Sequence, residues 1–417
     1  MPLKVIVVGA GVGGLATTIA LTRAGHNVEV FEKSSFSNEV GAAIHLAPNA
    51  TRILEAWHCD LEAMAPVRCE HMSLSNKQGN IVNMFVGKTT DELQKRFGFN
   101  DEWLLVHRVD LHNGLRRTAE AGFGGRAPKI HLGCGVESLD PSAGKVMLAD
   151  GREFHADVII GADGVHSRTV HSVAAEPQKK ISTRQTCFRF LVPTDKLSSN
   201  PSAKALVDRI GLKGLHAFRS KTEQLVLYPC RSGSLINCAA FLPTDDYDDD
   251  IGESSWLNSG QHSDLMAAVE SYGPELRELC SLAEDVKLWS LVSRDPPRSF
   301  VKGKVALVGD AGHPMLPHMG QGGAQAFEDA ATLGALLPAD TTPEQVAERL
   351  RMYNDVRYEH AVTIMFLSRV GEQFQEVVMG DLRRFVPSAR MPEDMFEYSW
   401  CSYPTRDAER ALASASN

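Results

Sequence analysis

The sequence predicts an α/β fold, in which a Rossmann-like βαβ unit at the N-terminus is joined by a second, mostly antiparallel sheet and by C-terminal helices. Residues 4–33 read as a strand, a glycine-rich turn, a helix and a second strand, which is the pattern of a dinucleotide-binding unit. Residues 72–86, 187–193 and 224–242 read as strands outside that unit, and a helix is predicted over residues 343–369. A chain of 417 residues can bury the cores of two domains.

Composition and charge exclude several classes of function. Hydrophobic residues make up 43% of the chain and charged residues 23%, as in ordinary globular proteins. The net charge is −9 without a long run of lysine and arginine, so we expect no nucleic-acid partner. The eight cysteines are scattered, without C-x-x-C pairs or zinc-ligand spacing, so we expect no metal and a reducing, cytoplasmic compartment. We expect neither a signal peptide nor a transmembrane segment, since no apolar run reaches the roughly 18 residues of a membrane span.

The glycines of the N-terminal unit have the spacing G-x-G-x-x-G. Gly9 permits the tight turn, Gly11 lets a pyrophosphate approach the backbone, and Gly14 lets the helix pack close to the strand. The helix N-terminus offers its amides and the positive end of its dipole to the phosphates. Glu32 ends the second strand, where it can accept hydrogen bonds from ribose hydroxyls and repel a 2′-phosphate, so FAD or NAD fits better than NADP. A glycine-rich turn of another α/β protein is the alternative interpretation.

Further candidate positions follow at the ends of predicted strands. Residues 41–43 are small enough for a ligand to pass close to the backbone, and a helix begins at Pro48. Residues 104–111 join a strand to a helix, with Arg108 at the junction, where a surface ion pair is the alternative role. Residues 129–136 read as a strand, and residues 156–164 read as a buried strand ending in Gly-Ala-Asp-Gly. Asp163 in that sequence either orients a ligand or caps a helix.

The second half of the chain is predicted to alternate between the two domains. A hairpin over residues 72–86 belongs to the second sheet together with residues 187–193 and 224–242, and residues 244–255 form an acidic loop. A helix is expected over residues 264–279. A buried strand at 304–308 precedes Gly-Asp-Ala-Gly-His-Pro, and a glycine-rich loop at 317–323 leads into a helix over residues 324–337. The tail after Arg390 has no strong pattern, and its last residues are expected to fray.

Three motifs in this order resemble those of the single-component, FAD-dependent aromatic hydroxylases, also called group A flavoprotein monooxygenases. They are GAGVGG with Glu32, GADGVHSR at residues 161–168 and VALVGDAGHPMLPHMGQGGAQAFEDA at residues 305–330. The strings GAAIHLAPNATRIL, LVHRVDLHNGL and W-x-L-x-x-R at residues 289–294 support the resemblance. It covers residues 3–370 and is closest to the salicylate-hydroxylase-like branch.

The resemblance implies a non-covalently bound FAD and a role for each matching residue. Glu32 resembles the acid that holds the adenosine ribose, Arg108 the arginine at the pyrophosphate, and Asp310 the acid on the ribityl chain. The amide of Gly323 lies where the family contacts the isoalloxazine ring. The full set of expected cofactor-binding residues is Gly9, Gly11, Gly14, Glu32, Lys33, Ala43, Arg108, Asp163, Asp310 and Gly323.

The chain departs from the family pattern at two positions. Val170 stands where the family usually has an arginine, so a nicotinamide contact by that side chain is in doubt. Gln224 stands where the family often has a histidine, so a histidine-based proton relay from that position cannot operate. His313 is a weaker catalytic candidate, because the family often has histidine there for structural reasons.

The implied reaction hydroxylates an electron-rich, phenolic ring. NADH or NADPH, visiting transiently, reduces FAD, and O₂ then forms a flavin C4a-hydroperoxide whose distal oxygen is attacked by the ring. A phenolate is a better nucleophile than a phenol, so the site needs a group that favours deprotonation. The catalytic candidates are Arg189, which can stabilise a phenolate or bind a carboxylate, and Tyr228, which can donate a hydrogen bond. The alternative roles are a buried ion-pair residue for Arg189 and a core aromatic for Tyr228.

The expected domain division is discontinuous. Residues 1–70, 98–172 and 290–340 form the FAD-binding domain, residues 71–97 and 173–289 the interleaved substrate-binding domain, and residues 341–417 a C-terminal helical region and tail. The expected partners are a small aromatic substrate, O₂ and NAD(P)H, and the protein is a monomer or a homodimer.

Three other functions are alternatives to hydroxylation. A related flavin epoxidase or oxidative-rearrangement enzyme acting on a natural-product scaffold would share every FAD motif and differ only in its pocket. A flavin-binding protein without oxygenase activity is the second alternative. A flavin halogenase would carry W-x-W-x-x-P, and no two of the five tryptophans lie two positions apart.

Overall fold

A computed structural model describes residues 1–36, 42–85, 95–178, 180–244, 260–370 and 375–415, and confirms the α/β fold. Its first sheet has the strand order β18-β19-β12-β1-β2-β8, and all but β18 run parallel. The strands β1 and β12 are apolar and buried throughout Val5–Val8 and Val158–Gly161, as expected for central parallel strands. The bounds are β1 Lys4–Val8, β2 Asn27–Glu32, β8 Lys129–Leu132, β12 Val158–Gly161, β18 Val301–Lys302 and β19 Val305–Leu307.

The helices α4 (Arg108–Ala121) and α9 (Gly322–Leu336) both pack against α1 (Val12–Arg23) beside the first sheet. A short helix, α5 (Thr169–Val173), follows β12, and a small antiparallel sheet is inserted between β8 and β12. That small sheet consists of β9 (Val136–Asp140), β10 (Lys145–Leu148) and β11 (Glu153–His155).

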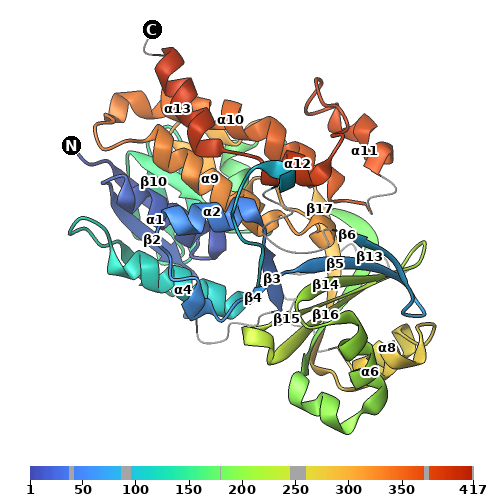
Figure 1. Cartoon of the computed structure of the whole chain (residues 1–417). Coiled ribbons are helices and arrows are strands. Elements are labelled where there is room, and N and C mark those ends of the chain that lie inside the picture. The colour runs from blue at the N-terminus through green and yellow to red at the C-terminus, as the bar shows by residue number, and fades with distance from the viewer. Residues whose placement is uncertain (37–41, 86–94, 179, 245–259, 371–374, 416–417) are drawn as a thin grey trace.

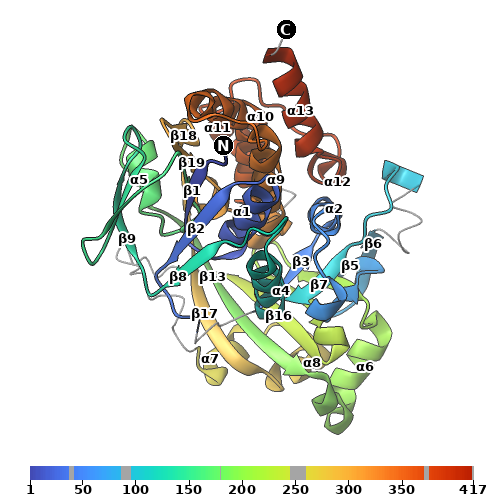
Figure 2. The same cartoon turned by 90° about the vertical axis from the view of Figure 1, so that its left-hand side faces the viewer.

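The second sheet has the order β17-β13-β16-β15-β14-β5-β6 and is antiparallel except for the pair β14 and β5. It forms the lower half of the molecule in Figures 1 and 2, with α6, α7 and α8 beneath it. This mostly antiparallel sheet was predicted. The bounds are β5 His71–Asn76, β6 Ile81–Phe85, β13 Lys180–Pro193, β14 Gly214–Arg219, β15 Gln224–Cys230, β16 Leu235–Pro243, β17 Glu284–Arg294, α6 Pro201–Ile210, α7 His262–Ala268 and α8 Pro274–Ser281.

A small sheet, β3-β7-β4, connects the two larger ones. Its strand β3 (Ala43–Leu46) pairs with β7 (Leu104–His107), and β7 pairs with β4 (Val67–Arg68). The helix α2 (Pro48–Ala56) follows β3 directly and packs on α9, while β7 contacts β15 of the second sheet. Residues of β3 are therefore placed between the two expected domains.

Further helices follow α9 and lie in the upper part of Figure 1. They are α10 (Val346–Leu367), α11 (Gln375–Leu382), α12 (Met395–Trp400) and α13 (Pro404–Ala415); α10 packs on α9, and α13 packs on both α9 and α10. No described helix has both the length and the apolar composition that a membrane crossing requires. Short 3-10 turns complete the chain at η1 Glu62–Met64, η2 Thr194–Ser199, η3 Arg231–Gly233, η5 Gly309–Ala311, η6 Pro317–Met319 and η7 Pro343–Gln345.

Several predicted elements differ from the observed ones. The expected strand 129–136 ends at Leu132, because Gly133 has a φ of +67° that breaks the extended chain. The expected helix 264–279 is two helices, because Gly273 and Pro274 interrupt it and Pro274 starts the second. The tail after Arg390, for which no pattern was found, contains α12 and α13. Residues 245–255 of the expected acidic loop lie outside the described residues.

The domain division stays a proposal. The structure places residues 71–76 of β5 and the strands from β13 to β17 in one sheet. The expected boundary between the substrate-binding and FAD-binding domains, at residue 290, lies inside β17 and so would divide one strand of this sheet.

Candidate active site

A cavity of about 500 Å³ lies between the carboxyl ends of the first sheet and the face of the second sheet. Parallel α/β sheets commonly bind ligands at this edge. Seven of the residues expected in the site line this one cavity: Gly11, Ala43, Arg108, Arg189, Tyr228, Asp310 and Gly323. The structure therefore brings the expected cofactor side and the expected substrate side into one continuous space.

The turn after β1 has the geometry that a pyrophosphate requires. Gly9 has a φ of +97°, and a Cβ there would lie 2.5 Å from the carbonyl oxygen of Ala162. A Cβ on Gly14 would lie 2.0 Å from the carbonyl oxygen of Gly9, so α1 packs against the turn only because both residues are glycine. Gly11, in contrast, faces open space, and no side chain caps the N-terminus of α1. The amides of this helix end thus remain for an anionic ligand.

Glu32 holds the same turn in place. Its Oε2 accepts a hydrogen bond from the Ala10 amide at 2.7 Å, and its Oε1 accepts one from the Ser34 amide at 2.8 Å. Each carboxylate oxygen retains a second lone pair for a ribose hydroxyl. Lys33 is exposed, and neither Glu32 nor Lys33 lines the cavity, so their contacts with a cofactor stay predictions.

Asp310 faces the cavity from the turn after β19. Its side chain is exposed to the cavity while protein surrounds the site, and this desolvation raises the pKa of the carboxyl, opposed by His313, Arg294 and Arg108. Arg294 donates a hydrogen bond to the Asp310 carbonyl at 2.8 Å and another to the Ala311 carbonyl. Burial lowers the pKa of Arg294 to about 10. The turn is thus fixed from behind, and the carboxylate remains available to accept from a ligand hydroxyl.

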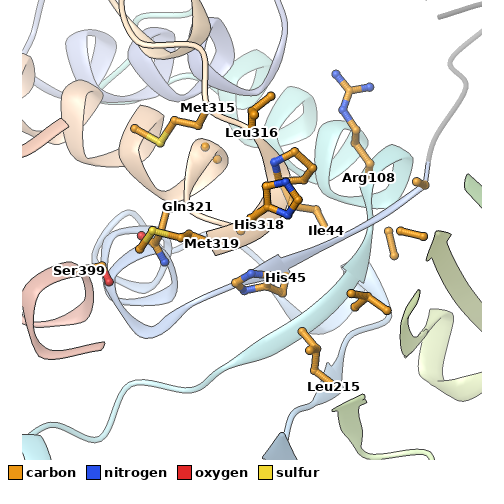
Figure 3. Close-up of a pocket in the computed structure, with 18 of the residues that line it drawn as sticks. Ile44, His45, Arg108, Leu215, Met315, Leu316, His318, Met319, Gln321 and Ser399 are labelled. Carbon is orange, nitrogen blue, oxygen red and sulfur yellow. The ribbon is translucent and has the colours of Figure 1, made fainter. Parts of the chain in front are cut away.

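Arg108 begins α4, and its side chain reaches the border of the cavity, as Figure 3 shows. Its amide donates to the Ala42 carbonyl at 3.1 Å, which fixes the start of the helix against β3. Gly323 is the second residue of α9, and the N-terminus of that helix has no side-chain cap. A cation beside one end of the cavity and uncapped amides at another fit the charges of a dinucleotide.

Asp163 caps its own loop. Its Oδ1 accepts from the Ser167 hydroxyl at 2.6 Å, and its Oδ2 accepts from the amides of Arg168 at 2.7 Å and Thr169 at 3.0 Å. These are the bonds of the helix-cap alternative, at the start of α5. The neighbouring Ala162 and Gly164 line the cavity instead. A contact of Asp163 with FAD stays a prediction.

Arg189 contributes a cation to the wall formed by the second sheet. Its guanidinium carbon lies 4.7 Å from the centre of the Trp289 ring, a cation–π contact. Within the described ranges no carboxylate forms an ion pair with it, so the buried ion-pair alternative is not what the structure shows. The tryptophan and the arginine of the W-x-L-x-x-R string thus have structural roles. Trp289 stacks on Arg189, and Arg294 holds the turn at Asp310.

Tyr228 is bonded to the backbone of β3. Its hydroxyl donates to the Ala43 carbonyl at 2.7 Å, and the Ala43 amide donates to Oδ1 of Asn237 at 2.9 Å. Burial raises the pKa of the Tyr228 hydroxyl, so the proton stays on it. Its single proton is therefore used within the protein, and both polar backbone groups of Ala43 are occupied. We call Tyr228 and Asn237 the β3 clamp.

Sequence reasoning missed several residues that line the cavity. His45 follows Ile44 on β3, and its Nδ1 accepts from the Trp103 indole at 3.1 Å. His318 donates from Nε2 to Oε1 of Gln185 at 2.9 Å, and burial together with Arg219 lowers the pKa of His318 to about 4. Figure 3 shows His45 and His318 in the middle of the cavity, with Arg108 on one side. Four residues of α12 also line it: Met395, Phe396, Ser399 and Trp400.

A buried polar network supports α9 behind the cavity. Arg357 of α10 donates to Glu328 at 2.7 Å and to Asp329 at 2.9 Å. Asp329 also accepts from His313 at 2.6 Å and from the Gly309 amide at 2.9 Å. His313 does not line the cavity and holds the turn that carries Asp310, which agrees with a structural role.

Comparison with known proteins agrees with this geometry. A family model described as "FAD binding domain" matches residues 2–367. The FAD-dependent monooxygenase cfoG of Aspergillus candidus is 35% identical over 98% of this chain and 94% of its own length. Hispidin-3-hydroxylase of Neonothopanus nambi is 32% identical over 91% of this chain and 90% of its own. A solved salicylate hydroxylase–substrate complex superimposes with a TM-score of 0.77 over 98% of both chains, at 22% identity.

Proposed function

The chain belongs to the FAD binding domain family and is an FAD-dependent monooxygenase, and we propose that it uses NADH or NADPH and O₂ to hydroxylate an electron-rich, phenolic ring. The single cavity that joins Gly11, Asp310 and Gly323 to Arg189 carries this proposal. A cofactor held by the first three residues and a ring beside the fourth would share one enclosed space, as oxygen transfer requires. The names of the hydroxylase relatives favour the same substrate class.

We propose that different residues on the cofactor side bind different parts of FAD. The turn at Gly9, Gly11 and Gly14 and the start of α1 would hold the pyrophosphate, and Asp310 would accept a ribityl hydroxyl. The uncapped N-terminus of α9 at Gly323 would face the isoalloxazine ring and stabilise negative charge there. When bound, FAD supplies the hydride acceptance and O₂ chemistry that no side chain provides.

Arg189 is the residue we propose to favour the phenolate. A guanidinium is always charged and stabilises an anionic oxygen by Coulomb attraction, so it lowers the pKa of a phenol beside it. Its stacking on Trp289 holds it at the cavity wall without a competing carboxylate in the described part of the chain. Tyr228 can donate to a substrate only by releasing the Ala43 carbonyl, so its proposed catalytic role is secondary to its role in the β3 clamp.

Partners and compartment follow as finer proposals. We propose a small aromatic substrate that enters with O₂ and a transient NAD(P)H, in a monomer or homodimer. All eight cysteines are free thiols, which supports a reducing compartment such as the cytoplasm.

The test combines cofactor reduction with product analysis. Purified protein, reconstituted with FAD, is mixed anaerobically with NADH or NADPH in the presence of each member of a panel of phenols, and the flavin absorbance is followed. Air is then admitted and products are weighed by mass spectrometry. A phenol that accelerates flavin bleaching and gains one oxygen atom supports the proposal. Failure of every phenol to do either would contradict it.

A further inference from the structure

The hydrogen bond from Trp103 to His45 indicates which tautomer of the imidazole is present. The indole nitrogen of Trp103 is a donor only, and it lies 3.1 Å from Nδ1 of His45. Nδ1 must therefore present its lone pair, and a neutral imidazole then carries its proton on Nε2. Burial lowers the pKa of His45 to about 4, so the ring stays neutral at ordinary pH. Trp103 is 4% exposed and packs on Trp400 at 5.2 Å, which keeps the donor in place.

The Nε2 atom of His45 lies against the loop before α9. A Cβ added to Gly320 would lie 1.6 Å from Nε2, so the imidazole occupies the space that any other residue would fill. Gly320 also has a φ of +60°, in the left-handed region. Only glycine thus allows the ring and the loop to approach so closely. The Nε2–H group therefore lies beside Gly320, and Gly320 precedes the first residue of α9, Gly322, by two positions.

No acceptor for Nε2 occurs among the described residues, although the ring lines the cavity. The ring is half-buried and Nε2 is not among the buried atoms without a partner, so the Nε2–H group is open to an acceptor inside the cavity. Two neighbours indicate which acceptor. Ala43 lies two residues earlier on β3, and Gly322 and Gly323 follow Gly320 in the loop. Gly323 is where the proposed function puts the isoalloxazine ring, whose carbonyl oxygens and ring nitrogens are acceptors, and Ala43 is one of the expected cofactor-binding residues.

We propose that the Nε2–H group of His45, oriented by Trp103, is a hydrogen-bond donor to an acceptor atom of the flavin ring. This inference rests on the proposed function, because it needs FAD in the cavity. Negative charge develops on the acceptor atoms when the ring gains electrons, and a fixed donor stabilises that charge more than the oxidised ring. His45 would therefore favour the reduced flavin and tune its midpoint potential. Arg189 and Tyr228 lie on the second sheet and remain the substrate-side residues.

The test measures the midpoint potential of bound FAD in the absence of any phenol. His45→Phe keeps a planar ring and removes the donor, and His45→Gln restores an N–H at a similar distance from the backbone. We expect His45→Phe to shift the equilibrium toward oxidised flavin about tenfold, which for this two-electron couple is about 30 mV more negative. His45→Gln should recover most of the shift. His155→Phe, a matched change on exposed strand β11, should leave the potential unchanged.

A second variant guards against loss of FAD from His45→Phe. Trp103→Phe keeps the imidazole and removes the group that fixes its tautomer, so a smaller shift of the same sign is expected, with a change in the visible flavin spectrum. Unchanged potentials and spectra in His45→Phe and Trp103→Phe would overturn the inference. Loss of phenol affinity at an unchanged potential would also overturn it, because the imidazole would then serve the substrate. Wild-type protein that binds no FAD would instead contradict the proposed function.

Discussion

At the scale of single residues, the carboxylate of Asp310 should govern FAD affinity. It faces the cavity from a turn that Arg294 fixes through two backbone carbonyls. A charge-assisted hydrogen bond to a ribityl hydroxyl contributes about 1.5–3 kcal/mol, so Asp310→Ala should raise the FAD dissociation constant about tenfold to a hundredfold. Asp310→Asn keeps an acceptor and should have a milder effect. Fluorescence titration of apoprotein measures both constants, and an unchanged value in Asp310→Ala would remove this residue from the site.

Arg189, by contrast, should govern the fate of oxygen rather than FAD affinity. Arg189→Ala removes the only proposed cation beside the substrate ring, and product formation should fall on the order of a hundredfold. NAD(P)H oxidation would continue, with hydrogen peroxide released in place of product. Arg189→Lys keeps the charge without the planar fork that stacks on Trp289, so rescue should be partial. Oxygen consumed, peroxide released and product formed are measured together, and a well-coupled Arg189→Ala enzyme would assign this arginine a structural role.

At the scale of elements, the β3 clamp should couple the second sheet to the cofactor side. Tyr228→Phe removes the donor to the buried Ala43 carbonyl, and an unsatisfied carbonyl costs about 1–3 kcal/mol. We expect lower stability in urea unfolding and poorer coupling of NAD(P)H oxidation to hydroxylation, because β3 carries Ala43 and His45. The matched control is Tyr358→Phe, which removes a hydroxyl that donates to the Pro297 carbonyl at 2.9 Å outside the cavity. It should lower stability alone, and equal coupling in both variants would refute the clamp's role.

The helix α12 should depend on Arg52 of α2. Arg52 donates to the Ser402 carbonyl at 2.9 Å and the Trp400 carbonyl at 3.2 Å, and it pairs with Asp101 at 2.8 Å. Arg52→Ala should destabilise the protein by about 1.5–3 kcal/mol and loosen the wall formed by Trp400. Chemical denaturation and acrylamide quenching of tryptophan fluorescence measure the two effects.

The control for this prediction is Arg410→Ala on α13. Its ion pair with Asp407 is largely exposed, so the free energy of unfolding should change by less than about 0.5 kcal/mol. Equal quenching in Arg52→Ala and wild type would show that α12 does not depend on this arginine.

The sequence predicted those elements whose structure depends only on residues close together in the chain. The strand β1, the turn at Gly9 and the hairpin of β5 and β6 follow from apolar runs, glycine spacing and alternation within a few residues. The expected site residues that line the cavity mostly follow strands of this kind. The helix α12 could not be predicted, since Trp400 is buried by Trp103, a residue about three hundred positions earlier. The bond from Tyr228 to Ala43 likewise joins residues far apart in the chain.

At the scale of the whole molecule, the buried network behind α9 should make stability depend on acid pH. Burial alone would raise the pKa of Asp329, but His313 and Arg357 outweigh it and lower that pKa to about 2. A carboxyl with a depressed folded-state pKa stabilises the protein above its unfolded pKa of about 3.9. That contribution is lost as the pH falls from about 4 toward 2. The free energy of unfolding, measured by denaturant titration at each pH, should fall through this window.

Asp329→Asn tests the assignment. At pH 7 it leaves Arg357 without one of its buried partners and should cost about 3–5 kcal/mol. The difference between variant and wild type should shrink below pH 4, because wild-type Asp329 then becomes protonated. Asp381→Asn, a change in an exposed pair with Arg384, should have little effect at any pH. A difference that stayed constant from pH 7 to pH 2 would show that Asp329 does not titrate in the folded protein.

The parallel pairing of β14 with β5 has a consequence for anyone who exchanges parts between related enzymes. Strand β5 comes from residues 71–76 and its partner β14 from residues 214–219, and strands β8 and β12 of the first sheet are encoded between them. A chimaera that transplants only residues 180–294 would join a foreign strand to a resident one along this seam. The transferable cassette is therefore two separate gene segments, supplemented by α12 from the C-terminal region. Recombination breakpoints placed in the loops on either side of all three should yield folded hybrids with altered substrate choice.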